Sequence, residues 1–405
     1  MKKLGLLPKL IIGIVLGIII GLIGATDIGF VSAVFYNLTR AMATFSGLFG
    51  NFISYIIPLI IIGFIVPGIA DLGGKAGKLL GIVLALAYIS TLLAGAWGWF
   101  GATMMMPFLV GAEGIVAENR EIYPFFEIAI TPIMGVMTAL VTAFILGLGT
   151  AAVKGKTLLS IAQEFQKIIK LVIEKVFLPF LPLHIAGIFA QMSYGGQIAS
   201  TLGIYGGVFL LTIMLDYFYI LFQYLASFFV TGKKPIKSLK QMIPAYMTAI
   251  GTQSSAATIP VSLRCMKTID GVDEEVAELV APLGASTHLS GSTITLISCA
   301  IAVLALDGIS LDFGQTFGFI MMLGVTMVAA PGVPGGAIMA ALGLLETMLG
   351  FTETQMGVMI AIYIAQDSFG TATNVMGDGA LALITNKYAK KGKNDDEQEL
   401  EEKAA

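Results

Sequence analysis

Long apolar runs recur along this chain and limit what it can fold into. Each is long enough to hold the helix of about twenty residues that crosses the apolar core of a bilayer. We expect eight crossings, near residues 8–25, 44–69, 79–106, 126–153, 168–192, 204–230, 278–305 and 355–385. Charged residues make up only 12% of the 405 residues, about half the share found in soluble domains. This is too few charged residues to cover a surface that faces water. Lipid must therefore be the solvent for much of the chain.

The positions of the lysines predict the orientation of the crossings. Cytoplasmic loops carry an excess of lysine and arginine. With eight crossings and both termini in the cytoplasm, the lysines gather on the inner side, at Lys78, Lys154, Lys156, Lys233, Lys234, Lys237, Lys387 and Lys390. Lys2 and Lys3 before the first run suggest a signal peptide, but the poor cleavage pattern favours a retained first helix. The tail from Asn394 is polar and is expected to be a solvated extension.

Composition argues against several classes of function. The net charge of −3 gives no basic field for nucleic acid. Cys265 and Cys299 make no disulfide framework, and two histidines, His184 and His288, are too few for a histidine-based metal cluster. His184 is expected to be structural. Because no nucleophile is matched with a base, we do not expect an enzyme.

Two apolar stretches, residues 241–268 and 314–350, do not fit as simple crossings. The first has two apolar arms of about ten residues around the polar sequence GTQSSAAT, so each arm is roughly half a membrane long. The second has apolar arms around AAPGVPGGA, through which no helix can run. We predict two re-entrant hairpins that enter from opposite faces, with tips buried in protein or lining a watery cavity.

A helix with a polar interruption follows each hairpin. The first contains PLGASTHLSGST at residues 282–293, and the second DSFGTATNVMGDG at residues 367–379. The fold class is therefore an all-α polytopic membrane protein with eight transmembrane helices and two re-entrant helical hairpins in inverted repeats. Such repeats are typical of secondary transporters, whose site lies at the membrane midplane.

Four polar residues of the last helix share one face: Asp367, Thr371, Asn374 and Asp378. Two carboxylates inside an apolar span need partners. A structural polar seam would provide them, as would a site for a cation and a solute. Glycines in the same segment favour local unwinding that frees carbonyls for a cation: Gly370, Gly377 and Gly379.

These motifs resemble the glutamate-transporter-homologue family, the dicarboxylate/amino acid:cation symporters. The resemblance runs in order through PAYMTAIGTQSSAATIPVSL, APLGASTHLSGST, GVPGGAIM and DSFGTATNVMGDGA, and covers residues 230–385 strongly. It implies a homotrimer in the plasma membrane of a bacterium or archaeon. The scaffold would comprise residues 1–78 and 107–203. The transport domain, which moves as an elevator, would comprise residues 79–106 and 204–385. A tail would follow at residues 386–405.

The resemblance also implies roles for single residues. Asp367 would bind a substrate amino group and Asn374 its carboxylate. The remaining substrate site would comprise Gln253, Ser254, Ser255, Ser292, Val333, Gly335, Gly370 and Thr371, with the hairpin tips as gates. One sodium ion would bind Asp378, Asn374 and the carbonyl of Gly284. A second would bind Ser286 and carbonyls of the second tip. Sodium ions are the only cofactors expected.

Departures from the family pattern bear on the substrate. Members that take acidic substrates have an arginine three residues after the amine-binding aspartate or at the first hairpin tip. These positions are Gly370 and Gln253 here. A carboxylate taken out of water without a cation costs several kcal/mol. We therefore expect a neutral substrate, or one larger than aspartate that fills the space at Gly370.

A further departure bears on the ions. Ser290 replaces the aspartate of another sodium site in the family, near Tyr88 and Thr91, so that site has lost its charge. His288 replaces a cation-ligating asparagine and is a candidate proton carrier or a packing residue. Asp216 is either a buried structural partner or a neighbour of the site.

We expect a symporter that takes up a small neutral amino acid with sodium. The alternative is a proton-coupled symporter, or one of altered stoichiometry, for a dicarboxylate or another small organic solute. A channel or receptor without active transport is a third hypothesis.

Overall fold

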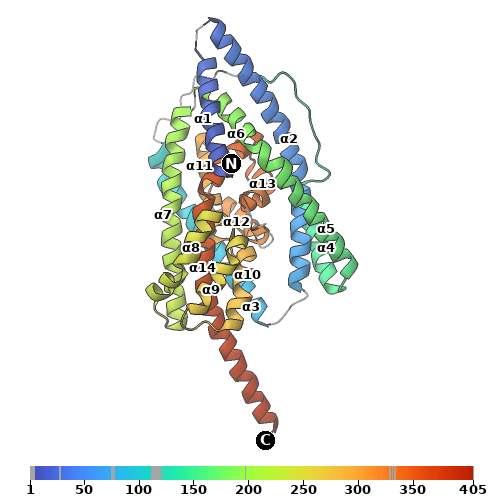
Figure 1. Ribbon diagram of the computed structural model, residues 1–405, viewed down its shortest axis with the longest axis vertical. Coiled ribbons are helices and arrows are strands. Elements are labelled where there is room, and N and C mark those ends of the chain that lie inside the picture. The colour runs from blue at the N-terminus through green and yellow to red at the C-terminus, as the bar shows by residue number, and fades with distance from the viewer. Residues whose placement is uncertain are drawn as a thin grey trace.

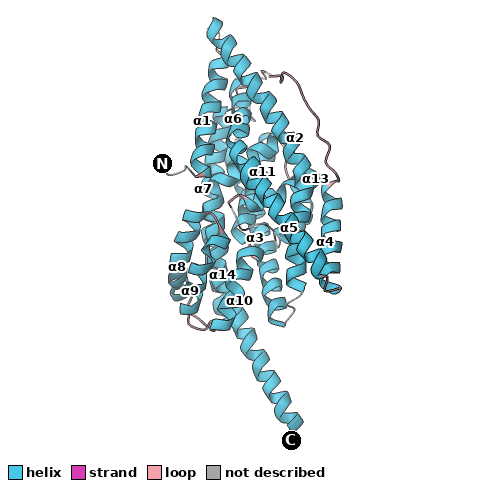
Figure 2. Ribbon diagram, turned by 45° about the vertical axis from the view of Figure 1, so that its right-hand side comes forward, coloured by secondary structure: helices cyan, strands magenta, loops and turns pink. Residues whose placement is uncertain are grey.

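The computed structural model describes residues 5–26, 29–73, 78–110, 120, 122–196, 198–327, 330, 332 and 334–404. These residues form helices and no strand (Figure 2). The elements are α1 Leu6–Gly24, α2 Gly29–Gly73, α3 Lys78–Val110, α4 Val136–Ala152, α5 Lys156–Val172, η1 Ile173–Phe177, α6 Leu178–Tyr194, α7 Ile198–Thr231, α8 Pro235–Thr252, α9 Ser255–Thr268, α10 Glu274–Thr287, α11 Ser290–Leu306, α12 Phe313–Met327, α13 Gly336–Leu349 and α14 Glu353–Ala404.

The predicted crossings correspond to this helix order. Six helical segments among the described residues are long and apolar enough to cross a membrane: α1, α2, α3, the joined α5–η1–α6, α7 and the joined α10–α11. The 17-residue α4 and the long α14 complete the eight. Large side chains such as Phe30 and Phe229 are 83% and 82% exposed. Apolar side chains on the outer surface are expected where lipid covers the helices.

Helix α1 lies very close to α6 along a glycine face made of Gly13, Gly17 and Gly21. A methyl group added at Gly17 would lie 2.2 Å from the carbonyl oxygen of Ala186. At Gly13 and Gly21 it would lie 2.5 and 2.2 Å from other carbonyl oxygens of α6. Small residues let membrane helices approach in this way and gain dispersion contacts.

The crossing predicted at residues 126–153 is shorter than expected. Residues 122–135 form an extended segment beside α2, and the helix that crosses is α4 (Figure 1). Side chains of α2 bind the backbone of this segment; Arg40 donates to the carbonyl of Tyr123 at 2.9 Å. Because α2 supplies these hydrogen bonds, the segment does not need helical ones.

Both re-entrant hairpins are confirmed. The first is α8 and α9, joined at Gln253 and Ser254, and the second is α12 and α13. The first lies toward the end from which α14 projects, and α13 lies toward the other end (Figures 1 and 2). Lys387 of α14 donates to the carbonyl of Val230 in α7 at the first of these ends.

One of the two predicted helix interruptions is present. Helix α10 ends at Thr287 and α11 begins at Ser290, so the chain breaks at His288 and Leu289. The unwinding predicted around Gly370, Gly377 and Gly379 is wrong, because α14 is continuous from Glu353 to Ala404.

The glycines of α14 serve close packing instead of unwinding. A methyl group at Gly377 would lie 2.6 Å from the amide oxygen of Gln223, and one at Gly379 would lie 2.4 Å from the hydroxyl oxygen of Tyr224. Helix α7 can therefore lie directly against α14. The tail expected to be a solvated extension continues α14 as a helix that projects from the bundle (Figure 1).

Candidate functional site

The tips of the two hairpins touch each other. The hydroxyl of Ser254 donates to the carbonyl of Gly332 at 2.5 Å, and the N–H of Ala256 donates to the same carbonyl at 3.4 Å. The Ser254 hydroxyl also accepts the N–H of Ala257 at 3.2 Å and so caps α9. Ser255, the first residue of α9, is buried. The two hairpins are thus joined at their tips.

Gln253 connects the first tip to α14. Its backbone has a φ of +52°, in the left-handed region, which ends α8 and turns the chain toward α9. Its side-chain amide donates to the hydroxyl of Ser368 at 2.9 Å. A neutral amide of the first tip therefore contacts α14 one position after Asp367.

Asp367 lies where the second hairpin meets α14. Its carboxylate accepts the N–H of Gly335 at 2.7 Å and the hydroxyl of Thr371 at 3.3 Å. The residue is only 4% exposed, and no lysine, arginine or histidine of the described residues forms an ion pair with it. A buried carboxylate in this position requires a positive partner from outside the chain or a proton.

Asn374 joins α14 to the start of α11. Its side-chain oxygen accepts the N–H of Gly291 at 2.8 Å and that of Ser292 at 3.2 Å, and its amide donates to the Ser292 hydroxyl at 2.9 Å. The first N–H groups of a helix have no partner within it. Asn374, on α14, supplies the missing acceptor. Two of the predicted site residues, Asn374 and Ser292, are therefore in contact.

Gly370 packs against the same part of α11. A methyl group there would lie 3.2 Å from the hydroxyl oxygen of Thr295 and 3.3 Å from the backbone nitrogen of Ser292. The space beyond Gly370 is therefore filled by α11. A substrate larger than aspartate, the other expectation for this position, would have to share this space with α11.

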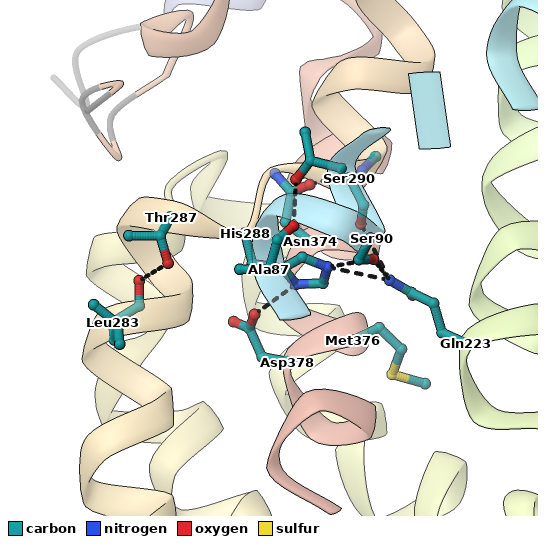
Figure 3. A network of polar contacts seen from close by, with 12 residues as sticks. Ala87, Ser90, Gln223, Leu283, Thr287, His288, Ser290, Asn374, Met376 and Asp378 are labelled. Atoms are coloured by element: carbon teal, nitrogen blue, oxygen red, sulfur yellow. Dashed lines mark hydrogen bonds and ion pairs between the residues drawn. The ribbon is translucent and has the colours of Figure 1, made fainter. Parts of the chain in front are cut away.

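His288 and Asp378 form a buried pair at the α10–α11 break. Nδ1 of His288 lies 2.9 Å from the carboxylate of Asp378, and the two side chains are 0% and 2% exposed. On its other side, Nε2 lies 3.0 Å from the Ser90 hydroxyl of α3 and 3.2 Å from the Gln223 amide of α7. Figure 3 shows the imidazole between these groups.

The other predicted sodium ligands, Gly284 and Ser286, differ in how far their oxygen atoms are free to bind an ion. The Gly284 carbonyl accepts the N–H of His288 at 2.9 Å, and Asp378 lies directly over Gly284, since an added methyl would be 2.5 Å from its carboxylate oxygen. Ser286 has an exposed side chain, and its hydroxyl donates to the Leu283 carbonyl at 3.0 Å.

Comparison with known proteins identifies the family. The model of the sodium:dicarboxylate symporter family matches residues 6–388. The chain belongs to the sodium:dicarboxylate symporter family. It is 28% identical over 247 residues to excitatory amino acid transporter 5 of Homo sapiens, which covers 60% of this chain and 44% of that protein. It is 31% identical over 182 residues to neutral amino acid transporter A of Homo sapiens, covering 44% of this chain and 33% of that protein.

The chain spans less than half the length of these curated relatives. The family is one of transporters and not of enzymes. Together with the helices described above, it makes this chain a multi-pass membrane protein. The resemblance seen in the motifs is confirmed.

Some predicted neighbours of the site lie elsewhere or are not described. Val333 lies outside the described residues. Tyr88 donates to the Met321 carbonyl at 3.3 Å and Thr91 to the Ala87 carbonyl of its own helix, so neither hydroxyl is bonded to Ser290. Both carboxylate oxygens of Asp216 are buried without a hydrogen-bond partner among the described residues, which does not support the first of its two expected roles, that of a buried structural partner.

Three polar residues of the site escaped the sequence reasoning: Ser90, Gln223 and Ser368. Each is polar within a helix expected to cross the membrane, which is the signal that could have drawn attention to them. His184 lies 2.9 Å from the Ser46 hydroxyl, and its ring is tilted against that of Phe49 with 5.2 Å between the centroids, in keeping with a structural role.

Proposed function

We propose that this chain is a symporter that takes up a small neutral amino acid together with sodium. The observation that carries the proposal is Asp367, a buried carboxylate with two neutral donors and no ion-pair partner among the described residues. The ammonium group of an amino acid would supply the missing positive charge.

A neutral side chain on the substrate fits the surroundings of Asp367. Gly370 packs on α11, and Gln253 offers an amide that already binds Ser368. Neither supplies the cation that an acidic side chain would need. The names of the relatives mention both excitatory and neutral amino acid transporters. The alternative is a dicarboxylate or another organic solute moved with protons or with fewer sodium ions, and the contact of His288 with Asp378 favours it.

Alternating access would follow from movement of one part of the chain against another. We assign residues 79–106 and 204–385 to a transport domain. Helices α3, α7, α8, α9, α10 and α14 share one apolar cluster, and α11 packs on α3, α7 and α14. Residues 1–78 and 107–203 would be the scaffold, in which α1, α2, α4, α5 and α6 pack on one another. The Ser254–Gly332 contact would act as a gate over the site. We place the carrier, as a homotrimer, in a bacterial or archaeal plasma membrane with both termini cytoplasmic.

Sodium would enter the same site as a second cargo. We place it at the end of α10, where the Ser286 side chain is exposed and the carbonyl of the neighbouring Ala285 faces Gly332 of the second tip. Oxygen atoms are the ligands that a hard cation such as sodium prefers.

Thermal unfolding of the purified protein tests the proposal. Amino acids would be compared in sodium and in choline, because a ligand of the folded state at a hundred times its Kd adds about 2.7 kcal/mol of stability. Neutral amino acids should stabilise in sodium, and Asp367→Asn should abolish the effect. Asp270→Asn, at an exposed carboxylate paired with Lys233, is the matched control and should keep it.

The other outcomes separate the alternatives. Stabilisation by aspartate or glutamate would contradict the neutral substrate. An unchanged response in Asp367→Asn would contradict the role of its carboxylate. In liposomes, flux without uphill accumulation would indicate a channel.

A further inference from the structure

The pair of His288 and Asp378 is closed within the protein. The carboxylate of Asp378 is in contact with Nδ1 of His288 at 2.9 Å, and both residues come from the part of the chain where helices α10, α11 and α14 meet. Both residues are at most 1% exposed. The partner of this buried carboxylate is therefore already present in the chain, in contrast to that of Asp367.

The hydrogen of this contact belongs to the imidazole. An ionised carboxylate only accepts, so Nδ1 carries the hydrogen. Nε2 lies 3.0 Å from the Ser90 hydroxyl and 3.2 Å from the Gln223 amide, so both ring nitrogens have polar neighbours. Gln223 also donates to the Ser90 oxygen at 3.0 Å, and the Ser90 hydroxyl lies 3.2 Å from that of Tyr219. The assignment, inferred from these bonds, fixes the ring with its N–H toward Asp378.

The other oxygens expected around a cation at Asp378 are also engaged. The Gly284 carbonyl accepts the backbone N–H of His288, and the side-chain oxygen of Asn374 accepts two N–H groups of α11. A sodium ion gives up its hydration shell only where several oxygens replace it. A cation at Asp378 would lie against the N–H of His288 at one carboxylate oxygen, and it would compete with three further N–H donors for the other oxygens.

We propose that His288 takes the place of a coupled cation at Asp378, so that this carrier moves its solute without a sodium ion at that carboxylate. The inference deepens the proposed function, on which it rests, by reducing the number of coupled ions. Sodium would then bind only elsewhere, such as beside Ser286. His288 would be a determinant of stoichiometry and not a substrate ligand.

The number of coupled sodium ions can be measured by linkage. The slope of log apparent amino acid affinity against log sodium concentration counts the ions bound together with the solute. The purified wild type would be compared with Asp378→Asn, His288→Asn and the double variant. Asp378→Asn keeps an oxygen that can accept the N–H of His288, so the contact and the fold should survive.

We expect equal slopes for the wild type and Asp378→Asn. His288→Asn removes the imidazole from the carboxylate and should raise the slope by about one ion, and the double variant should return it to the wild-type value. This cycle assigns the gained ion to the carboxylate of Asp378.

Two results would overturn the inference. The first is a slope for Asp378→Asn about one ion below that of the wild type, which would place a sodium ion at Asp378. The second is a well-folded His288→Asn variant without a gain in slope. If His288→Asn does not fold, the comparison of wild type with Asp378→Asn decides alone. A wild-type slope of zero with intact amino acid binding would contradict sodium coupling in the proposed function, while a gain in His288→Asn would still support the inference.

Discussion

Replacing Asn374 with alanine removes the side chain that joins α14 to the start of α11. The N–H groups of Gly291 and Ser292 would lose their acceptor, and both lie at the beginning of a helix where no carbonyl of that helix can replace it. A buried donor left without a partner costs about 1–3 kcal/mol. Two such donors give an expected loss of about 2–6 kcal/mol in the free energy of unfolding.

Thermal unfolding of the purified protein without solute measures this loss apart from any effect on binding. Asn374→Asp keeps an oxygen for both N–H groups at a helix N-terminus, where negative charge is favourable, so it should lose less than Asn374→Ala. Gln355→Ala is the matched control. The half-buried Gln355 accepts the N–H of Thr352 at 2.8 Å in an exposed hydrogen bond, where water can replace it. Equal stability of Asn374→Ala and Gln355→Ala would show that the Asn374 side chain does not hold the start of α11.

Three further substitutions test other contacts. Gly284→Ala places a methyl group 2.5 Å from the Asp378 carboxylate and should lower the stability to thermal unfolding by about 1–3 kcal/mol. Gly251→Ala, at a position with no neighbour within 4 Å, is its control, and equal melting temperatures would contradict the close packing. Asp216→Asn removes a buried carboxyl group without a hydrogen-bond partner among the described residues, so its melting temperature should equal or exceed that of the wild type. A clear decrease would show that Asp216 has a stabilising partner. Ser254→Ala removes both the cap of α9 and the bond to Gly332, and should speed hydrogen exchange of the Ala257 amide. Unchanged exchange would mean that the tip is held by other contacts.

The hairpins could be predicted from the sequence because their signal is local. An apolar arm of half-membrane length, a polar or glycine-rich tip and a second arm leave few other structures in lipid. The break at His288 was also predictable, since the surrounding polar and small residues interrupt an otherwise apolar helix. The face shared by Asp367 and Asn374 followed from helical spacing alone.

The remaining features depend on contacts between distant parts of the chain. The glycines of α14 suggested unwinding, but Gly377 and Gly379 allow α7 to approach, and the sequence of α14 alone cannot distinguish these uses. Nor could it pair His288 with Ser90, a residue 198 positions away. The extended segment 122–135 is apolar enough to suggest a helix, and only the side chains of α2 show why it is not one.

The close approach of α1 and α6 determines which substitutions α1 can tolerate. Ile11 and Leu16, on the outer side of α1, are each 51% exposed, so most apolar replacements should be neutral there. At the glycine face even alanine, the smallest change, would push its methyl group into a carbonyl of α6. Whether α1 tolerates a substitution should therefore depend on which face of the helix carries the residue, and not on the depth of the residue in the bilayer.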